Sequence, residues 1–288
     1  MAVLISAAQL HERLRSPRPP VLLDVRWTLG AADGREKYLR GHLPGAVYVE
    51  MDTELSAPAV PAEGRHPLPD PAAFAEAARG WGLNDGDTVV VYDDAAGTSA
   101  ARAWWLLRHA GEKDVFLLDG GLAAWREAGL PLENGPVSPE PGTAHLSWGH
   151  MPVVGLPEVC RVAAEGTLLD ARAPERYRGE TEPVDPRAGH IPGAVNRPST
   201  DNLAADGTFR SPAELRASFE ALGARPDRPV AAYCGSGIFA AHEVAALAHA
   251  GMSAALYPGS WSQWSSTPGT PAAVGADPGR AENPPQKG

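Results

Sequence analysis

Two stretches of the sequence decide the fold: Gly41-His-Leu-Pro-Gly-Ala-Val47 and Gly189-His-Ile-Pro-Gly-Ala-Val195. They differ at a single position and lie 148 residues apart. Three further motif pairs recur in the same order, at offsets between 139 and 146 residues. These pairs are Leu22-Leu-Asp-Val-Arg26 with Leu168-Leu-Asp-Ala-Arg172, Thr88-Val-Val-Val-Tyr92 with Pro229-Val-Ala-Ala-Tyr233, and Asp119-Gly-Gly-Leu-Ala-Ala-Trp125 with Pro258-Gly-Ser-Trp-Ser-Gln-Trp264. Recurrence of this kind predicts that the chain is an internal duplication.

The two halves share one plan of secondary structure. Short runs rich in Val and Leu predict buried strands, and segments with helical spacing lie between them. Strands are expected at Val21–Val25, Val89–Tyr92 and Val115–Leu118, and helices at Pro71–Ala78, Ala100–His109, Pro212–Ala221 and Ala240–Ala250. Helices between strands act as crossovers, so we expect an α/β fold in which each half is a parallel sheet with helices on both faces.

The length and composition indicate two domains. A chain of 288 residues is long for one core and suits two domains of ordinary size. The stretch 131–155 is rich in Pro, Gly and Ser, which is typical of a linker. We therefore predict a first domain over 1–135, a linker over 136–155, a second domain over 156–266, and an irregular tail over 267–288 that is rich in Pro and Gly.

The bulk composition argues against several classes of function. A net charge of -10 disfavours a nucleic-acid groove, which needs clustered Lys and Arg. The sequence lacks an apolar run of the roughly 20 residues that a membrane helix needs, and its start does not resemble a secretory signal. Two cysteines do not make a disulfide framework, and a cytoplasmic location is expected. Because the Cys and His residues do not have ligand spacing, we expect neither a metal nor a cofactor.

The strongest chemical signal is the loop in Tyr233-Cys-Gly-Ser-Gly-Ile-Phe-Ala-Ala241, between a predicted strand and a predicted helix. Gly235 and Gly237 allow the backbone to curl so that successive amides point at one centre. The helix that follows adds its positive N-terminal end. Both effects favour a thiolate at Cys234, and the thiolate is the nucleophile. Cys160, in contrast, lies in an ordinary amphipathic helix and is expected to be structural.

Two chemistries fit a cysteine in an anion-binding loop. A cysteine phosphatase needs an Arg six residues after the Cys to bind phosphate oxygens, and that position is Ala240. Sulfur transfer needs no such arginine, because backbone amides can stabilise a persulfide anion. The sequence therefore favours transfer of sulfur to Cys234. The alternative is a non-catalytic persulfide-binding or sensing module built on the same fold.

The repeated motifs and the cysteine loop resemble those of the tandem-domain rhodanese family of thiosulfate and 3-mercaptopyruvate sulfurtransferases. The resemblance runs from about residue 5 to about residue 265 and includes Tyr257-Pro-Gly-Ser-Trp-Ser-Gln-Trp264. It implies two tandem rhodanese-like domains with the active cysteine in the second. The first half has Tyr92-Asp-Asp94 at the position of the cysteine, which matches the inactive first domain of the family.

The resemblance also implies roles for individual residues. Arg176 matches the family arginine that contacts the donor's anionic group, and Arg187 is a candidate for a second one. Asp170 and Arg172 match residues that brace the active loop. The amides of Gly235, Gly237, Ile238 and Phe239 are expected to cradle the persulfide.

A proton-transfer group is implied as well. Ser236 matches a loop serine that mercaptopyruvate enzymes are proposed to use together with a His and an Asp, and the matching positions here are His66 and Asp52. Local structural roles for these three residues are the alternative. His42 and His190 recur in both halves, which indicates a role in the fold.

The loop further favours one donor. The neutral Cys234-Gly-Ser-Gly237 resembles mercaptopyruvate enzymes, whereas thiosulfate enzymes place Arg and Lys after the Cys. The continuation Ile238-Phe-Ala240 departs from the Val-Thr-Ala of the family, so Phe239 either narrows the mouth of the site or faces the core. The partners implied are a small anionic sulfur donor and a thiol or thioredoxin-like acceptor, with cyanide as acceptor in an assay.

Overall fold

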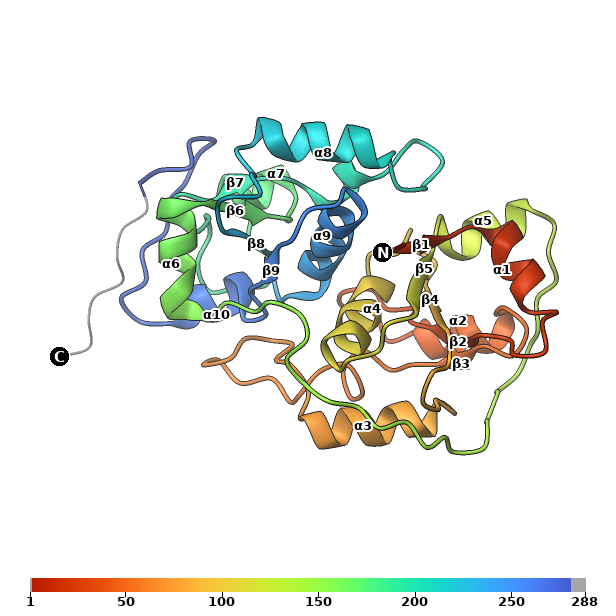
Figure 1. The fold of residues 1–288 in the computed structure, drawn as a ribbon. Coiled ribbons are helices and arrows are strands. Elements are labelled where there is room, and N and C mark those ends of the chain that lie inside the picture. The colour runs from red at the N-terminus through yellow and green to blue at the C-terminus, as the bar shows by residue number, and fades with distance from the viewer. Residues whose placement is uncertain (1, 281–288) are drawn as a thin grey trace. The chain divides into compact units, whose positions relative to one another are not determined.

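The computed structural model describes residues 2–280, which divide into two compact units (Figure 1). Unit 1 comprises the chain up to Ala57, Leu68–Met151 and Leu203–Phe209. Unit 2 comprises Pro58–Pro67, Pro152–Asn202 and the chain from Arg210 onward. The ten-residue segment Pro58–Pro67 therefore belongs to the second unit, although it lies far inside the first half of the sequence. The predicted boundaries did not include this exchange.

Among the described residues, unit 1 has a five-stranded parallel sheet in the order β1-β5-β4-β2-β3. Its strands are β1 Leu4–Ile5, β2 Val21–Asp24, β3 Val47–Tyr48, β4 Val89–Tyr92 and β5 Val115–Leu118. Its helices are α1 Ala7–Arg13, α2 Gly34–Arg40, α3 Pro71–Gly80, α4 Ala100–His109 and α5 Gly121–Glu127.

In the part of unit 2 that the structure describes, a four-stranded parallel sheet has the order β7-β6-β8-β9. Its strands are β6 Thr167–Asp170, β7 Val195–Asn196, β8 Val230–Tyr233 and β9 Ala255–Leu256. Its helices are α6 Leu156–Glu165, α7 Pro174–Tyr177, the 3-10 helix η1 Ser199–Asn202, α8 Pro212–Ala221, α9 Ile238–His249 and α10 Ser260–Ser266. This strand order matches β3-β2-β4-β5 of unit 1, so the two halves repeat in structure as they do in sequence.

The predicted strands and helices are confirmed, with small shifts at their ends. The clearest shift is in α9, which begins at Ile238, two residues before the predicted start. Gly237 has a left-handed backbone with φ of 84°, and this turn carries the chain directly into the helix. As a result only Cys234 to Gly237 separate the end of β8 from α9, so the cysteine lies at the carboxyl edge of a central strand.

The core of unit 2 shows how helices cover both faces of its sheet. On one face, buried side chains of α6 and α10, including Cys160 and Trp261, pack with Leu168 of β6 and Tyr233 of β8. On the other face α9 packs against β8 and β9. Cys160 therefore lies in the predicted helix, on its buried side.

The described part of the predicted tail is irregular and forms backbone hydrogen bonds with unit 2. In the described part of the predicted tail, Ala273 forms an antiparallel bridge with His190, and their backbones exchange two hydrogen bonds of 2.9 Å. The last eight residues of that predicted tail, 281–288, lie outside the described residues. Across residues 2–280, none of the helices combines the length and the apolar character that a bilayer crossing demands.

Candidate active site

The loop that follows β8 holds Cys234 in a buried position. Cys234 is 3% exposed, and its Sγ accepts a hydrogen bond from the amide of Gly237 at 3.1 Å. Its own backbone is bound to the start of α10, because its amide donates to Ser260 Oγ at 3.1 Å and its carbonyl accepts from Trp261 N at 3.0 Å. A sulfur that faces a backbone amide at a helix N-terminus is suited to carry negative charge.

Gly237 is required by the geometry of this loop. Its φ of 84° lies in the left-handed region, and a Cβ on it would lie 2.5 Å from the carbonyl oxygen of Pro258. Any side chain at this position would therefore strain the backbone of Gly237 and collide with the carbonyl of Pro258. This explains the second glycine of the Gly-x-Gly pattern that follows the cysteine.

Two guanidinium groups lie over the residue that follows the cysteine. A Cβ built on Gly235 would be 3.1 Å from Arg65 Nη2 and 3.3 Å from Arg176 Nη1. Arg176 comes from α7 and was predicted from the sequence. Arg65 was not predicted; it comes from the segment Pro58–Pro67, and its amide donates to Ser262 Oγ of α10 at 3.1 Å. The only sequence signal for Arg65 was its place directly before His66.

Two buried carboxylates hold these arginines. Asp185 bonds Arg65 Nη1 through Oδ1, and its Oδ2 lies 3.3 Å from Arg176 Nη2. Glu182 Oε1 accepts from the same Arg176 Nη2 at 2.6 Å. Burial raises the pKa of Asp185, and the charge of Glu182 adds to this, although both arginines oppose it. Within residues 2–280, the Nε–H groups of Arg65 and Arg176 are buried without a hydrogen-bond partner, so each guanidinium keeps one donor that is not satisfied.

A second buried ion pair connects this network to the sheet. Arg172 donates to both carboxylate oxygens of Asp170 and to the carbonyl of Gly189 at 2.7 Å. Its Nη1 also lies 3.4 Å from Glu182, and its guanidinium lies 4.8 Å from the ring centroid of Trp261. Arg172 thus joins the end of β6, the Glu182 loop and α10. Unit 1 repeats the arrangement with Asp24 and Arg26.

The structure brings His66 and Ser236 together, as the sequence suggested. His66 Nδ1 lies 2.7 Å from Ser236 Oγ, and both residues are buried. The contact forms within unit 2, because the segment Pro58–Pro67 carries His66 into that unit. Asp52 belongs to unit 1, and its place beside His66 remains a prediction.

Arg187 lies in a different environment from Arg176. Its guanidinium donates to the carbonyls of Trp264 at 2.8 Å, Ser265 at 2.8 Å and Thr270 at 2.6 Å. It therefore closes the C-terminal end of α10, where carbonyl groups have no helical partner. The structure does not bring Arg187 to the Cys234 loop through these contacts, and its role in binding a donor stays a prediction.

The remaining predicted residues also have defined surroundings. Ile238 is buried in the first turn of α9, whereas Phe239 is 37% exposed. Of the two predicted orientations of Phe239, the exposed fraction excludes the core. His190 stacks on Tyr177 with ring centroids 3.7 Å apart, and His42 stacks on Tyr38 at 4.2 Å, as expected of a repeated role in the fold.

Unit 1 has the same loop with a carboxylate in place of the thiol. Asp93 follows β4 as Cys234 follows β8, and its carboxylate is fully buried. The backbone amides that donate to it, each at 2.8 Å, belong to Ala95, Gly97, Ser99 and Ala100. The loop of unit 1 is therefore an anion cradle occupied by its own side chain.

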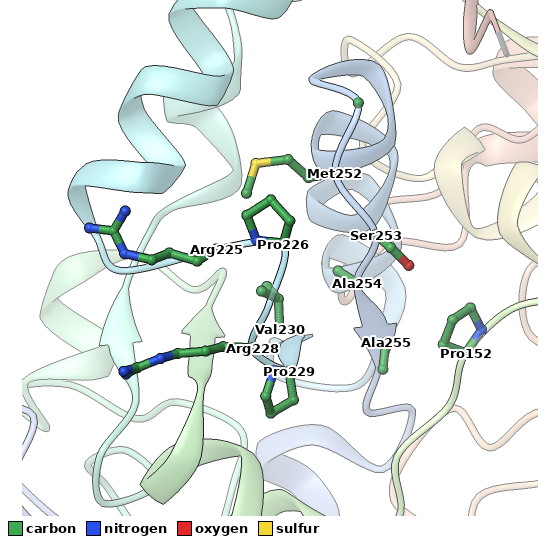
Figure 2. A pocket seen from close by; sticks show the side chains of 11 residues that line it. Pro152, Arg225, Pro226, Arg228, Pro229, Val230, Met252, Ser253, Ala254 and Ala255 are labelled. Atoms are coloured by element: carbon green, nitrogen blue, oxygen red, sulfur yellow. The ribbon is translucent and has the colours of Figure 1, made fainter.

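A cavity of about 510 Å³ lies elsewhere in unit 2 (Figure 2). It is lined by residues such as Arg225, Pro229 and Met252, near the start of β8 and β9. Cys234 follows the opposite end of β8, so this cavity is separate from the cysteine loop.

Comparison with known proteins agrees with this geometry. A family model for the rhodanese-like domain matches residues 6–128 and again 159–267. The chain belongs to the rhodanese family. The first match contains strands β2 to β5 of unit 1, and the second contains the whole sheet of unit 2 together with Cys234, Arg176 and Ser236.

Individual relatives cover nearly the whole rhodanese chain. A Mycobacterium tuberculosis protein, provisionally named thiosulfate sulfurtransferase SseB, is 48% identical over 95% of this chain and 97% of its own. A Pseudomonas aeruginosa protein, provisionally named 3-mercaptopyruvate sulfurtransferase, is 46% identical over 95% of this chain and 99% of its own. The crystal structure of the 3-mercaptopyruvate enzyme SseA from Escherichia coli has a TM-score of 0.79 at 35% identity, covering 91% of this chain and 99% of that one.

Proposed function

We propose that this rhodanese is a sulfurtransferase that takes sulfur from 3-mercaptopyruvate in preference to thiosulfate, through a persulfide on Cys234. The observation that carries the proposal is that the Cys234 loop, two arginines and the His66–Ser236 pair all belong to unit 2 and lie close together. The Gly237 amide faces Sγ at 3.1 Å, and the arginines lie over the adjacent Gly235. Relatives named for each of the two donors support the reaction class.

In the first step the Cys234 thiolate attacks the sulfur of the donor. The new S–S bond forms as the C–S bond of mercaptopyruvate breaks, and the electron pair of that bond passes to the enolate of pyruvate. The proton of the donor thiol moves to the methylene carbon, which leaves pyruvate and the persulfide anion. His66 and Ser236 are placed to relay this proton. With thiosulfate, the same attack releases sulfite and requires no proton.

The positive charge of the site comes from outside the cysteine loop. Gly235, the residue after Cys234, leaves room for the guanidinium groups of Arg65 and Arg176. Guanidinium groups bind carboxylates through paired hydrogen bonds, so these two arginines are the proposed binding site for the donor's carboxylate. Arg65 is thus a second proposed ligand of the donor beside Arg176, and the corresponding role of Arg187 stays a prediction.

In the second step a thiol or thioredoxin-like protein accepts the outer sulfur, and cyanide does so in an assay. The acceptor attacks the outer sulfur of the persulfide, the S–S bond breaks, and the Cys234 thiolate returns. We place the reaction in the cytoplasm, where reducing conditions keep cysteines reduced; both cysteines of the described chain are free thiols.

The test is cyanide-dependent formation of thiocyanate with each donor in parallel. Cys234→Ser is expected to abolish turnover, whereas Cys160→Ser, which changes a buried thiol of α6, is the matched control and should retain it. A higher rate with thiosulfate would keep the mechanism and overturn the donor preference. Folded protein without turnover on either donor would leave a persulfide-binding module as the function.

A further inference from the structure

Asp185 occupies an unusual position between the two arginines of the site. Its side chain is 2% exposed, and its two oxygens bond one guanidinium each, Arg65 through Oδ1 and Arg176 through Oδ2. In the described chain, the hydrogen-bond donors to this carboxylate are these two guanidinium groups. The carboxylate of Asp185 thus makes the same contacts with Arg65 and Arg176 that the carboxylate of a bound donor would make.

Glu182, the other carboxylate on Arg176, is held differently. Its Oε1 accepts from the backbone amides of Val184 at 3.1 Å and Asp185 at 3.0 Å, and its Oε2 lies 3.4 Å from Arg172. Glu182 is therefore part of the folded loop itself. Asp185 lacks such backbone support and shares Arg176 with Glu182, so the two negative charges repel each other.

We propose that Asp185 is a specificity-determining residue, a resident counter-anion that holds Arg65 and Arg176 in the empty enzyme and disfavours donors of high negative charge. The inference rests on the proposed function and adds to it the basis of donor selection. Arg65, Arg172 and Arg176 are matched in number by Asp170, Glu182 and Asp185, so their summed charge is zero. An incoming anion meets this balanced cluster and must compete with Asp185 for both arginines.

The effect depends on the charge of the donor. Mercaptopyruvate with a protonated thiol carries one negative charge, whereas thiosulfate carries two. Coulomb repulsion from Asp185 is proportional to the charge of the ligand. If removing the Asp185 charge improves binding of a monoanion by a factor f, a dianion at the same distance gains about f squared. With f of about 3, the dianion gains about tenfold.

The experiment measures binding apart from turnover. In a Cys234→Ser background, calorimetry at constant ionic strength compares pyruvate, a monoanion, with sulfate, a dianion, before and after Asp185→Asn. We expect the affinity for sulfate to rise about tenfold and that for pyruvate about threefold. In the active enzyme, the same substitution should lower the KM for thiosulfate more than the KM for mercaptopyruvate.

Two further variants make the result decisive. Asp185→Ser repeats the measurement with a smaller side chain, in case the Asn variant unfolds. Glu182→Gln is the matched control: it removes one negative charge from Arg176 but leaves Asp185 between the two guanidinium groups, so its gain in sulfate affinity should be smaller than that of Asp185→Asn. Unchanged or weaker sulfate binding in both Asp185 variants, or an equal gain for both anions, would overturn the inference. Absence of turnover in the wild-type protein would instead refute the proposed function. That result is distinguishable, because calorimetry measures anion binding independently of turnover.

Discussion

His66 Nδ1 and Ser236 Oγ lie 2.7 Å apart, although 170 residues separate them in the sequence. The contact exists because the segment Pro58–Pro67 leaves unit 1 and packs within unit 2. Gln263 of α10 donates to the carbonyl of Ala62 in this segment at 2.6 Å. The first half of the chain thereby supplies a histidine and an arginine to the cysteine loop of the second.

The His66–Ser236 pair predicts a difference between donors. Ser236→Ala is expected to lower kcat with mercaptopyruvate by about a hundredfold, because the pyruvate enolate loses its proton relay. The loss with thiosulfate should be much smaller, since sulfite leaves without a proton. Steady-state rates with both donors test this. An equal loss with both would indicate that Ser236 only shapes the loop.

Arg65 and Arg187 are expected to fail in different ways when each is replaced by Gln. Arg65→Gln should raise the KM for mercaptopyruvate by about 10- to 100-fold, which is the range for one charged hydrogen bond. Arg187→Gln should mainly lower the melting temperature, because the carbonyls of Trp264, Ser265 and Thr270 lose their donor. Thermal unfolding and KM, measured on both variants, separate the two roles. A large rise in KM for a stable Arg187 variant would restore Arg187 as a donor ligand.

Asp93 predicts a stability effect in unit 1. Asp93→Ala leaves the buried amides of its loop without an acceptor and should reduce the free energy of unfolding by about 3 kcal/mol or more. Asp94→Asn, at the exposed neighbouring position, should change it by less than about 0.5 kcal/mol. Urea unfolding of the two variants gives the comparison. Similar stability of both would show that the cradle tolerates an empty centre.

Glu243 predicts how stability depends on pH. It is fully buried in α9, and burial raises its pKa to about 8, while the charge of Arg197 and a 2.7 Å hydrogen bond from Asn202 oppose the rise. The folded state therefore keeps a proton that the unfolded chain releases above its ordinary pKa of 4.5. Stability should fall as pH rises from about 4.5 to about 8, by an amount on the order of a few kcal/mol, and then level off.

Urea unfolding between pH 5 and pH 9 measures this dependence, with Glu243→Gln as the comparison. The Gln variant stays neutral at every pH, so its stability should lack this decline. A decline of the same size in both proteins would assign it to other groups.

The sequence by itself was sufficient for the architecture and for the central nucleophile. The recurring motifs around Gly41 and Gly189 revealed the duplication, and alternation of Val-rich runs with helical spacing identified the strands and helices. These signals are local, since strand pattern and helix periodicity involve residues close in the chain. The Gly-x-Gly pattern after Cys234 could be interpreted for the same reason, because Gly237 is required by the backbone conformation of its own loop.

Only the tertiary structure showed that Arg65 and Asp185 join the predicted Arg176 near the cysteine loop. Arg65 reaches Gly235 because Pro58–Pro67 packs on α10, and Asp185 joins Arg65 to Arg176 through side chains alone. Arg187, close to Arg176 in sequence, turns instead to the carbonyls at the end of α10. An ion pair leaves no periodic pattern in the sequence, because its partners need only meet in space. The nucleophile and Arg176 could therefore be predicted from the sequence, whereas Arg65 and Asp185 became visible only in the fold.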